Sequence, residues 1–405
     1  MLRASRRLFS TFADTDVVIC SIARTPIGSF NGSLSSFSAP QLGAMAIRTA
    51  VERAGISKSD VQEVIMGNVV SAGSGQAPSR QATLFAELPN SVISTDINKV
   101  CASGMKAIMV AAMTIQTGHS RCIVAGGMES MSNIPYYLPK ARNGLRYGHG
   151  EVLDGILRDG LLDAYQGVAM GFFADATARK YGITREDQDA FAVESYKRAT
   201  EAAKNGNLKN EIFGVSVAGK KGDAVIVSED EEVKNVKYDR IPTLKPAFEK
   251  NGTVTAANSS KINDGAAALV LMSGEKARSG GYKPLARIVT FADAAHEPEW
   301  FTTTPELVIT KLLNKKGMKP KDVDFFEINE AFAVVSLTNN KLLGLDPARV
   351  NVFGGAVAMG HPIGCSGARI VGTVTNVLHQ KNGQFGVAAI CNGGGGGSAI
   401  LVERL

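Results

Sequence analysis

The feature that most constrains the fold is a repeat that relates the first third of the chain to its last third. The segment Gly55–Asn68 (GISKSDVQEVIMGN) resembles Gly317–Glu330 (GMKPKDVDFFEINE), which begins 262 residues later. Two further pairs follow in the same order: Ser103–Ile108 with Ser366–Val371, and Ala125–Gly127 with Asn392–Gly394. Order and spacing together indicate duplication of a whole domain rather than chance likeness between glycine-rich turns.

Both copies alternate strand-like and helix-like segments. In the first copy we expect a strand at 16–22, a helix at 42–54, a strand at 61–66, a helix at 102–117 and a strand at 122–125. In the second copy we expect a helix at 305–316, a strand at 323–328, a helix at 366–380 and a strand at 386–391. Such alternation is typical of α/β proteins, in which helices cover the faces of sheets.

The middle of the chain breaks this pattern. It contains a stretch rich in Tyr, Pro and Gly (134–150), an amphipathic helical pattern (185–205) and a charged stretch (229–250). We therefore predict a loop domain at 132–257. It interrupts a first half at 14–131, which 258–283 completes, and precedes a second half at 284–405.

Composition excludes several classes of protein. Hydrophobic residues make up 44% of the chain and charged residues 20%, which is typical of a globular protein with a large core. No run of about 18 apolar residues occurs, so we expect no membrane-spanning segment. Aromatic residues are only 6%, and no block of like charges is long enough for a nucleic-acid patch.

The first thirteen residues (MLRASRRLFSTFA) form a candidate leader. Arg3, Arg6 and Arg7 are basic, and no acidic residue precedes Asp14. This pattern indicates a mitochondrial presequence and a matrix location; the alternative is a disordered cytosolic tail. None of the five cysteines has the spacing of a zinc site, which agrees with a reducing compartment.

Cys101 is the first candidate catalytic residue. It stands at the expected start of the helix ASGMKAIMVAAM. A helix N-terminus favours a thiolate, so we expect a depressed pKa and a nucleophile. A buried structural cysteine is the alternative reading.

Three more candidates follow the strands and turns of the second copy. His361 lies among glycines in GGAVAMGHPIGCSG, which lets backbone approach a ligand closely. Cys391 begins CNGGGGGSA after a strand, where consecutive amides of a turn can bind an oxyanion. Asn329 ends another strand and could either anchor a water molecule or cap the following helix.

The motifs NKVCASGMKA, GGMESMSN, NEAF, GGAVAMGHPIGCSGAR and CNGGGGGSA together resemble the thiolase family. The resemblance runs from Asp16 to Leu405 and is nearest to the acetoacetyl-CoA thiolases of mitochondria. It implies a five-layered αβαβα core from two duplicated halves, an inserted loop domain and a homotetramer. The implied activity is that of an acetyl-CoA C-acetyltransferase, which reversibly cleaves acetoacetyl-CoA with CoA; 2-methylacetoacetyl-CoA is a second candidate substrate.

The resemblance also implies a role for each candidate. Cys101 would carry the acetyl group as a thioester, and His361 would take the proton of its thiol. Cys391 would move the proton at the substrate α-carbon. Asn329 would hold a water molecule in one oxyanion hole, and the amides of Cys101 and Gly393 would form another.

Further positions follow from the same resemblance. The residues implied for coenzyme A are Tyr196, Asn235, Val236, Lys237, Arg240 and Ser260. The residues implied for a potassium ion are Tyr196, Ala256, Ala257, Ser259 and Val357, mostly through backbone carbonyls. The chain departs from the usual family residues at Ala169, Trp300 and Phe353, and also at Asn235 and Ser259.

Three other functions stay open at this stage. A broad 3-ketoacyl-CoA thiolase of fatty-acid oxidation would use the same chemistry with a longer pocket. A non-catalytic CoA-binding or lipid-binding protein would not need two cysteines, a histidine and an asparagine. A ketoacyl synthase lacks the second cysteine, so Cys391 disfavours it.

Overall fold

One mixed sheet runs through the chain in the computed structural model, which describes residues 12–219 and 223–405. Its strands are β1 (Val17–Arg24), β2 (Gly28–Ser29), β3 (Glu63–Gly67), β4 (Ile93–Ile97), β5 (Cys122–Ser130), β10 (Asn263–Ser273), β11 (Ala286–Ala295), β12 (Phe325–Ile328), β13 (Phe385–Asn392) and β14 (Gly396–Arg404). They are hydrogen-bonded in the order β12-β13-β14-β11-β1-β10-β5-β3-β4, with β2 attached to β10.

The sheet has two similar halves that meet where β1 pairs with β11. Outward from this junction, one half runs β1-β10-β5-β3-β4 and the other runs β11-β14-β13-β12. The pair β5–β3 is parallel, like β13–β12, and the pair β10–β5 is antiparallel, like β14–β13. Strand β4 is an additional edge strand of the first half, parallel to β3. The predicted duplication is therefore visible in the topology as well as in the sequence.

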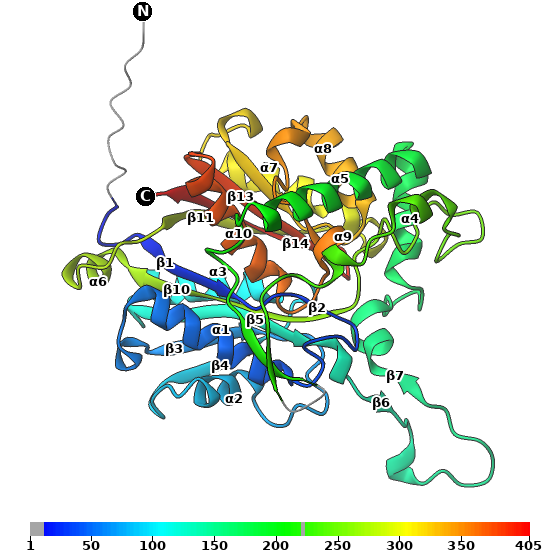
Figure 1. Ribbon diagram of the computed structural model, residues 1–405, viewed down its shortest axis with the longest axis horizontal. Coiled ribbons are helices and arrows are strands. Elements are labelled where there is room, and N and C mark those ends of the chain that lie inside the picture. The colour runs from blue at the N-terminus through cyan, green and yellow to red at the C-terminus, as the bar shows by residue number, and fades with distance from the viewer. Residues whose placement is uncertain (1–11, 220–222) are drawn as a thin grey trace, which may run out of the picture.

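The two halves of this sheet and the helices that pack on their faces form five layers, as expected (Figure 1). The helices of the core are α1 (Ala39–Ala54), α2 (Pro78–Phe85), α3 (Ser103–Gln116), α6 (Gly274–Ser279), α7 (Thr304–Asn314), α8 (Ala333–Leu343), α9 (Ala356–Met359) and α10 (Ser366–Gln380). Helix α1 packs outside the first half and α7 outside the second, whereas α3 and α10 lie between the two halves.

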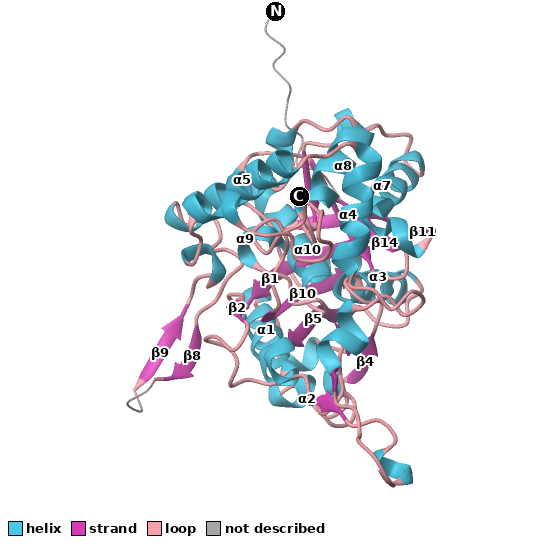
Figure 2. Cartoon of the chain, turned by 90° about the vertical axis from the view of Figure 1, so that its right-hand side faces the viewer, coloured by secondary structure: helices cyan, strands magenta, loops and turns pink. Residues whose placement is uncertain are grey.

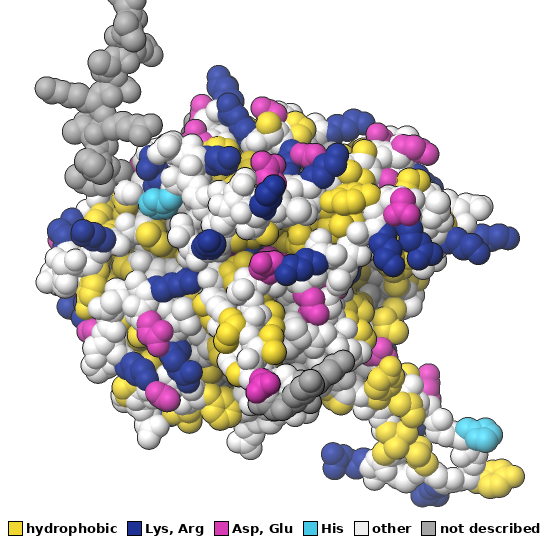
Figure 3. Space-filling view, in the orientation of Figure 1, with side chains coloured by type: hydrophobic (Ala, Val, Ile, Leu, Met, Phe, Trp, Pro, Cys, Tyr) yellow, Lys and Arg dark blue, Asp and Glu magenta, His cyan; other side chains and the backbone are white. Residues whose placement is uncertain are grey.

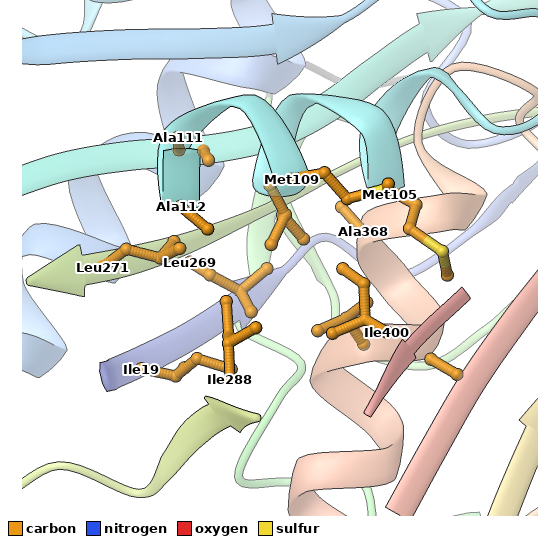
Figure 4. Packing of buried hydrophobic residues seen from close by; sticks show 14 of the residues in the cluster. Ile19, Met105, Met109, Ala111, Ala112, Leu269, Leu271, Ile288, Ala368 and Ile400 are labelled. Atoms are coloured by element: carbon orange, nitrogen blue, oxygen red, sulfur yellow. The ribbon is translucent and has the colours of Figure 1, made fainter. Parts of the chain in front are cut away.

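The central layer is the main hydrophobic core (Figure 4). Met105 and Met109 of α3 and Ala368 of α10 are at most 2% exposed and pack with Leu269 of β10 and Ile400 of β14. Each buried Met, Leu or Ile side chain of this set stabilises the fold by about 1.5–3 kcal/mol. The layer therefore joins the two halves into one core.

Two glycines at matching positions let α3 and α10 approach closely near their N-termini. A Cβ atom on Gly367 of α10 would lie 2.4 Å from the backbone nitrogen of Met105. A Cβ atom on Gly104 of α3 would lie 2.8 Å from the carbonyl oxygen of Gly364. Any larger side chain would push the helices apart, so glycine here brings the loops that precede both helices together.

The segment between β5 and β10 contributes helices and two projecting arms. Its elements are β6 (Tyr136–Tyr137), β7 (Leu153–Asp154), α4 (Met170–Tyr181), α5 (Arg185–Lys204), β8 (Val215–Ala218) and β9 (Ala224–Val227). Helix α5 packs on α8 and α9. The arm between β6 and β7 (Figure 1) and the hairpin β8–β9 (Figure 2) extend away from the core.

Most elements match their sequence-based predictions within three residues, and the exception has a structural cause. The strand expected at 122–125 continues to Ser130. It stays paired with β10 through two glycines, where a Cβ on Gly127 would lie 2.0 Å from the Gly364 carbonyl oxygen. Glycines that signal a turn in sequence here permit close packing of a continuing strand.

The leader prediction falls on residues 1–13, of which 1–11 lie outside the described residues. Within the described part of the chain, no helix is long and apolar enough to cross a membrane.

Candidate active site

Cys101 lies in a tight turn between β4 and α3. The preceding residue, Val100, has φ of 48°, a conformation that is strained for a β-branched side chain. The hydroxyl of Ser103 stabilises the turn, since it accepts from the amide of Lys99 (2.8 Å) and donates to the carbonyl of Val100 (2.6 Å). Strain held in place by neighbouring hydrogen bonds is typical of a functional site.

The expected low pKa of Cys101 is wrong for the free protein. Burial raises the pKa of this thiol to about 11, although the amides of Gly393 and of Cys101 itself favour the thiolate. Cys101 also precedes the helix, which begins at Ser103. Desolvation therefore outweighs the dipole and the amide hydrogen bonds, and the resting thiol is neutral.

Cys391 lies on the second half of the core but reaches the same place. It is fully buried near the end of β13. Its pKa is raised first by burial and then by the neighbouring Cys101 thiol. The structure thus brings together two sulfur atoms that lie far apart in the sequence, with the amide of Gly393 beside Cys101.

His361 is held by its backbone and by one side of its ring. Its amide donates to Oδ1 of Asn263 at 2.9 Å. Ring Nδ1 lies 2.6 Å from the Ser366 hydroxyl, which itself donates to the Pro362 carbonyl at 3.0 Å. Nδ1 must then carry the proton, which leaves Nε2 unprotonated and able to accept a hydrogen bond.

The imidazole of His361 is neutral. Burial, and secondarily the charge of Arg369, lowers its pKa to about 3. Its Nε2 atom lies 3.4 Å from Nδ2 of Asn329. A neutral ring with a free Nε2 can accept a proton, and the same atom becomes a donor once it is protonated.

Asn329 does not cap the next helix, so that alternative is wrong. Helix α8 begins at Ala333, and its N-cap residue is Phe332. The backbone amide of Asn329 donates to Ala389 at 2.9 Å, which fixes the end of β12 against β13. Its buried Oδ1 has no hydrogen-bond partner among the described residues, which suits a position that binds a polar ligand or water.

Glu129 is a buried residue that sequence reasoning missed. Its carboxylate accepts from the side chain of Asn68 (2.9 Å) and from the amides of Val69 (3.0 Å), Val70 (3.2 Å) and Gly364 (2.8 Å). Burial raises its pKa to about 7 against these donors. Glu129 therefore ties the loop after β3 to the loop that carries His361. The motif GGMESMSN contains it, but no spacing rule assigned it a task.

A pocket of about 530 Å³ opens next to these residues. Its walls are mostly apolar, with Leu161, Met170, Phe248, Phe332 and Ile363 among them. His361 and Ala169 also line it. Met170 also lies next to the Gly393 turn, because its sulfur lies 3.8 Å from the position a Cβ on Gly393 would take.

The residues implied for coenzyme A are only partly gathered here. Ser260 lines the pocket, together with Glu232. The segment that follows Glu232 presents Lys237 and Arg240, both exposed, and before them Asn235, which is exposed, and Val236, which is half-buried. Tyr196 is buried and lies edge-to-face with Tyr238, with ring centroids 6.4 Å apart.

Lys261, which the sequence reasoning did not single out, reaches the position implied for potassium. Its Nζ atom donates to the carbonyls of Val357 (2.6 Å) and Ser259 (3.1 Å) and lies 4.9 Å from the ring centroid of Tyr196. Burial lowers the pKa of Lys261 to about 8, which Glu232 and Glu330 oppose. Ala256, a further implied ligand, lines the adjoining pocket, and Ala257 follows it. The residues implied for potassium therefore do not fit that ion, because the ammonium group of Lys261 already occupies two of their carbonyl oxygens.

The remaining cysteines belong to the core. Cys20, Cys122 and Cys365 are buried, and burial raises each pKa to about 12. Among the residues that the structure describes, no cluster of three or more His, Cys, Asp or Glu side chains could bind a metal ion.

Comparisons with known proteins agree with this geometry. The family model described as "Thiolase, N-terminal domain" matches residues 17–275, and the one described as "Thiolase, C-terminal domain" matches residues 282–404. The chain belongs to the thiolase family. It is 56% identical to a mitochondrial acetyl-CoA acetyltransferase of Xenopus laevis, over 96% of this chain and 92% of that protein. It is 52% identical to a cytosolic acetyl-CoA acetyltransferase of Gibberella zeae, over 96% of this chain and 98% of that protein.

A solved thiolase structure has the same fold. The crystal structure of the Acat5 thiolase from Ascaris suum in complex with coenzyme A superposes with a TM-score of 0.92 at 47% identity. The match covers 96% of this chain and all of the Ascaris chain. The five-layered thiolase architecture expected from the sequence is therefore confirmed.

Proposed function

We propose that this thiolase is an acetyl-CoA C-acetyltransferase that cleaves acetoacetyl-CoA with CoA through an acetyl-cysteine intermediate. One observation carries the proposal: Cys101 and Cys391 come from opposite halves of the core, yet Cys101 is near enough to raise the pKa of Cys391, and the Gly393 amide lies beside Cys101. The names of full-length relatives support the same activity.

In the first step, the sulfur of Cys101 attacks the 3-keto carbon of acetoacetyl-CoA, and Nε2 of His361 accepts the thiol proton. Because both groups are neutral at rest, this transfer must accompany bond formation. The bond between C2 and C3 then breaks. Its electrons go to the enolate of acetyl-CoA, which takes a proton from Cys391, while the acetyl group stays on Cys101.

In the second step, Cys391 takes the thiol proton of an incoming CoA. The CoA sulfur attacks the acetyl carbonyl, Cys101 leaves, and its sulfur recovers the proton from His361. Two acetyl-CoA molecules result, and every proton is returned. A thiol suits both positions, because its ordinary pKa is near neutrality.

Two groups of donors stabilise the oxyanions. Protonated Nε2 of His361 and a water molecule held by Asn329 face the thioester carbonyl oxygen of the substrate, which becomes the enolate oxygen when the C2–C3 bond breaks. The amides of Cys101 and Gly393 face the carbonyl oxygen of the acetyl thioester. One such donor contributes about 2.7–4 kcal/mol to transition-state stabilisation.

Coenzyme A is the proposed second substrate. Its pantetheine arm would occupy the apolar pocket past Ser260, and its phosphates would meet the exposed cations Lys237 and Arg240. The Ascaris thiolase, whose structure contains coenzyme A, supports this assignment. Replacing Arg240 by Ala should raise KM for CoA without changing kcat, as steady-state kinetics would measure.

A substrate series tests the choice among the candidate functions. We expect the highest kcat/KM with acetoacetyl-CoA and a decline as the acyl chain lengthens. Strong activity on long chains would indicate the broad 3-ketoacyl-CoA thiolase instead. Binding of CoA with no turnover of any 3-ketoacyl-CoA would indicate a non-catalytic binder. Ala169 in the pocket wall leaves room beside the acyl group, so 2-methylacetoacetyl-CoA belongs in the series.

We also propose a homotetramer in the mitochondrial matrix. The arm between β6 and β7 exposes Leu138, Tyr147 and Val152. Hydrophobic side chains gather on the projection at the lower right of Figure 3. Apolar side chains on a projecting arm are typical of a contact between subunits. Sedimentation should give four copies of the 42.7 kDa chain, and Tyr147→Asp should dissociate it.

Location is tested separately from assembly. A fusion of residues 1–13 to a fluorescent protein should enter mitochondria, which cytosolic fluorescence would contradict. The boundaries proposed for the loop domain, 132–257, remain a prediction that limited proteolysis can check.

A further inference from the structure

The ammonium group of Lys261 holds together three separate elements. Its Nζ atom donates to Ser259 in the segment before β10 and to Val357 in α9. It also lies over the ring of Tyr196 in α5 at 4.9 Å, within range of a cation–π interaction. These three residues are ones that the family resemblance implied for a potassium ion.

The surroundings are built for one positive charge. Glu232 lines the same pocket, and the buried Glu330 accepts from the amide of Val357 at 3.1 Å and from the hydroxyl of Ser195 at 2.7 Å. A potassium ion on the carbonyls of Ser259 and Val357 would sit in contact with the ammonium. Two like charges that close repel strongly away from bulk water.

We propose that Lys261 serves as a tethered cation that takes the place of potassium, so that this enzyme works without a monovalent metal ion. The carbonyl oxygen of Lys261 accepts from the amide of His361 at 3.3 Å. Clamping α9 and the segment before β10 therefore positions the imidazole. Lys261 acts as a positioning residue, because its contacts are with the scaffold that holds His361.

The first test uses the unaltered protein. Its kcat/KM for acetoacetyl-CoA thiolysis and its Tm should be the same in potassium chloride and in tetramethylammonium chloride at equal ionic strength. Crystals soaked in thallium(I), a heavy analogue of potassium, should show no anomalous peak beside the carbonyls of Ser259 and Val357. Activation by potassium, or a thallium peak there, would overturn the proposal.

Two variants sharpen the test. Lys261→Ala removes the ammonium and leaves space, so kcat should fall by about 10- to 100-fold without potassium and recover when potassium is added. Its Tm should rise with potassium, and thallium should now bind. Lys261→Met fills the space without charge, so potassium should restore neither its activity nor its Tm.

An exposed lysine provides the matched control. Lys245→Ala should keep the activity and Tm of the unaltered protein in both salts. A Lys261→Ala protein that folds but gains no response to potassium in activity, Tm or thallium binding would contradict the proposal. If that variant does not fold, the unaltered protein still decides.

The proposal rests on the proposed function only for its kinetic readout. Tm and thallium binding do not require acetoacetyl-CoA to be the substrate. Failure of the substrate series with intact salt independence would therefore refute the proposed reaction and leave the role of Lys261 standing.

Discussion

In the first half of the core, the loop before the central helix α3 carries Cys101; in the second half, the loop before α10 carries His361. Counted back from the first residues of the two helices, Ser103 and Ser366, the counterpart of His361 is Asn98. When the repeat is carried from β3 and β12 along the strand pairings, Met128 of β5 is the counterpart of Cys391 of β13, so the pairing of Ala125–Gly127 with Asn392–Gly394 expected from the sequence is four residues out of register. Equivalent places in one framework thus hold different side chains.

What the two halves share is the course of the backbone and the glycines that allow close contact. Gly104 and Gly367 occupy the same position in their helices, and each would clash with the opposite helix if it carried a Cβ. The chemical groups are divided between the halves. The first half supplies the Cys101 thiol, and the second supplies the His361 imidazole, the Gly393 amide and the Cys391 thiol. A complete pocket exists only when both halves are packed together.

The largest effect should come from removing the two thiols one at a time. Cys101→Ala should lower kcat by about 10⁴-fold or more, because it removes the group that carries the acetyl unit. Cys391→Ala should lower overall turnover but still let acetyl-CoA acetylate Cys101, more slowly than in the unaltered protein, because that exchange needs no proton at the α-carbon and CoA can leave as a thiolate. Turnover and acetyl incorporation, measured in parallel, distinguish the two. Equal loss of acetylation in both variants would mean that the halves do not divide the steps.

Acid stability should reveal the buried imidazole of the second half. Between pH 6.5 and 3 the unfolded chain binds a proton at His361 and the native chain does not, so the free energy of unfolding falls as pH falls. The loss is on the order of 5 kcal/mol. His361→Asn, which installs the residue type of the counterpart Asn98, should flatten denaturation midpoints across this range. An unchanged slope would show that the imidazole is not held neutral.

The two asparagines at the strand ends should differ in kind. Asn329→Ala should lower kcat by about 10²–10³-fold, with Tm little changed, because it removes an oxyanion-hole partner. Asn68→Ala removes a donor to the buried Glu129 and should lower Tm by an amount that corresponds to about 1–3 kcal/mol. Kinetics and thermal melts on both variants check this. The reverse pattern would contradict the roles given to β12 and to the loop after β3.

The smallest effect compares two glycines of one helix. Gly367→Ala should destabilise the protein by about 1–3 kcal/mol, because its Cβ would meet the backbone of Met105. Gly372→Ala in the same helix places its Cβ at an ordinary 3.7 Å from Ile22 and should stabilise by up to about 1 kcal/mol. Urea denaturation measures both. Similar values would mean that the helix contact is not tight at Gly367.

The sequence predicted the duplicated framework well, because the repeat and the alternation of strands and helices are local patterns. It also singled out Cys101, His361, Cys391 and Asn329. It did not predict the raised pKa of Cys101, because desolvation depends on what packs around the thiol and not on its place near a helix.

Two further residues escaped prediction for a similar reason. The carboxylate of Glu129 bonds to loops that are distant in sequence, and only the folded chain shows its partners. Lys261 stands beside a recognisable motif, yet a lysine next to serines reads as an exposed charge. Its hydrogen bond to the carbonyl of Val357, almost a hundred residues away in the chain, shows instead that it links two elements of the fold.

The proposed mechanism requires that the sulfur atom of Cys101 carries the acetyl group. The direct measurement is peptide mass spectrometry after brief exposure to acetoacetyl-CoA and an acid quench. The account predicts one added acetyl group, located on the peptide that contains Cys101, and none on that peptide in Cys101→Ala. An acetyl group on Cys391 or on any other residue, with Cys101 unmodified, would contradict it.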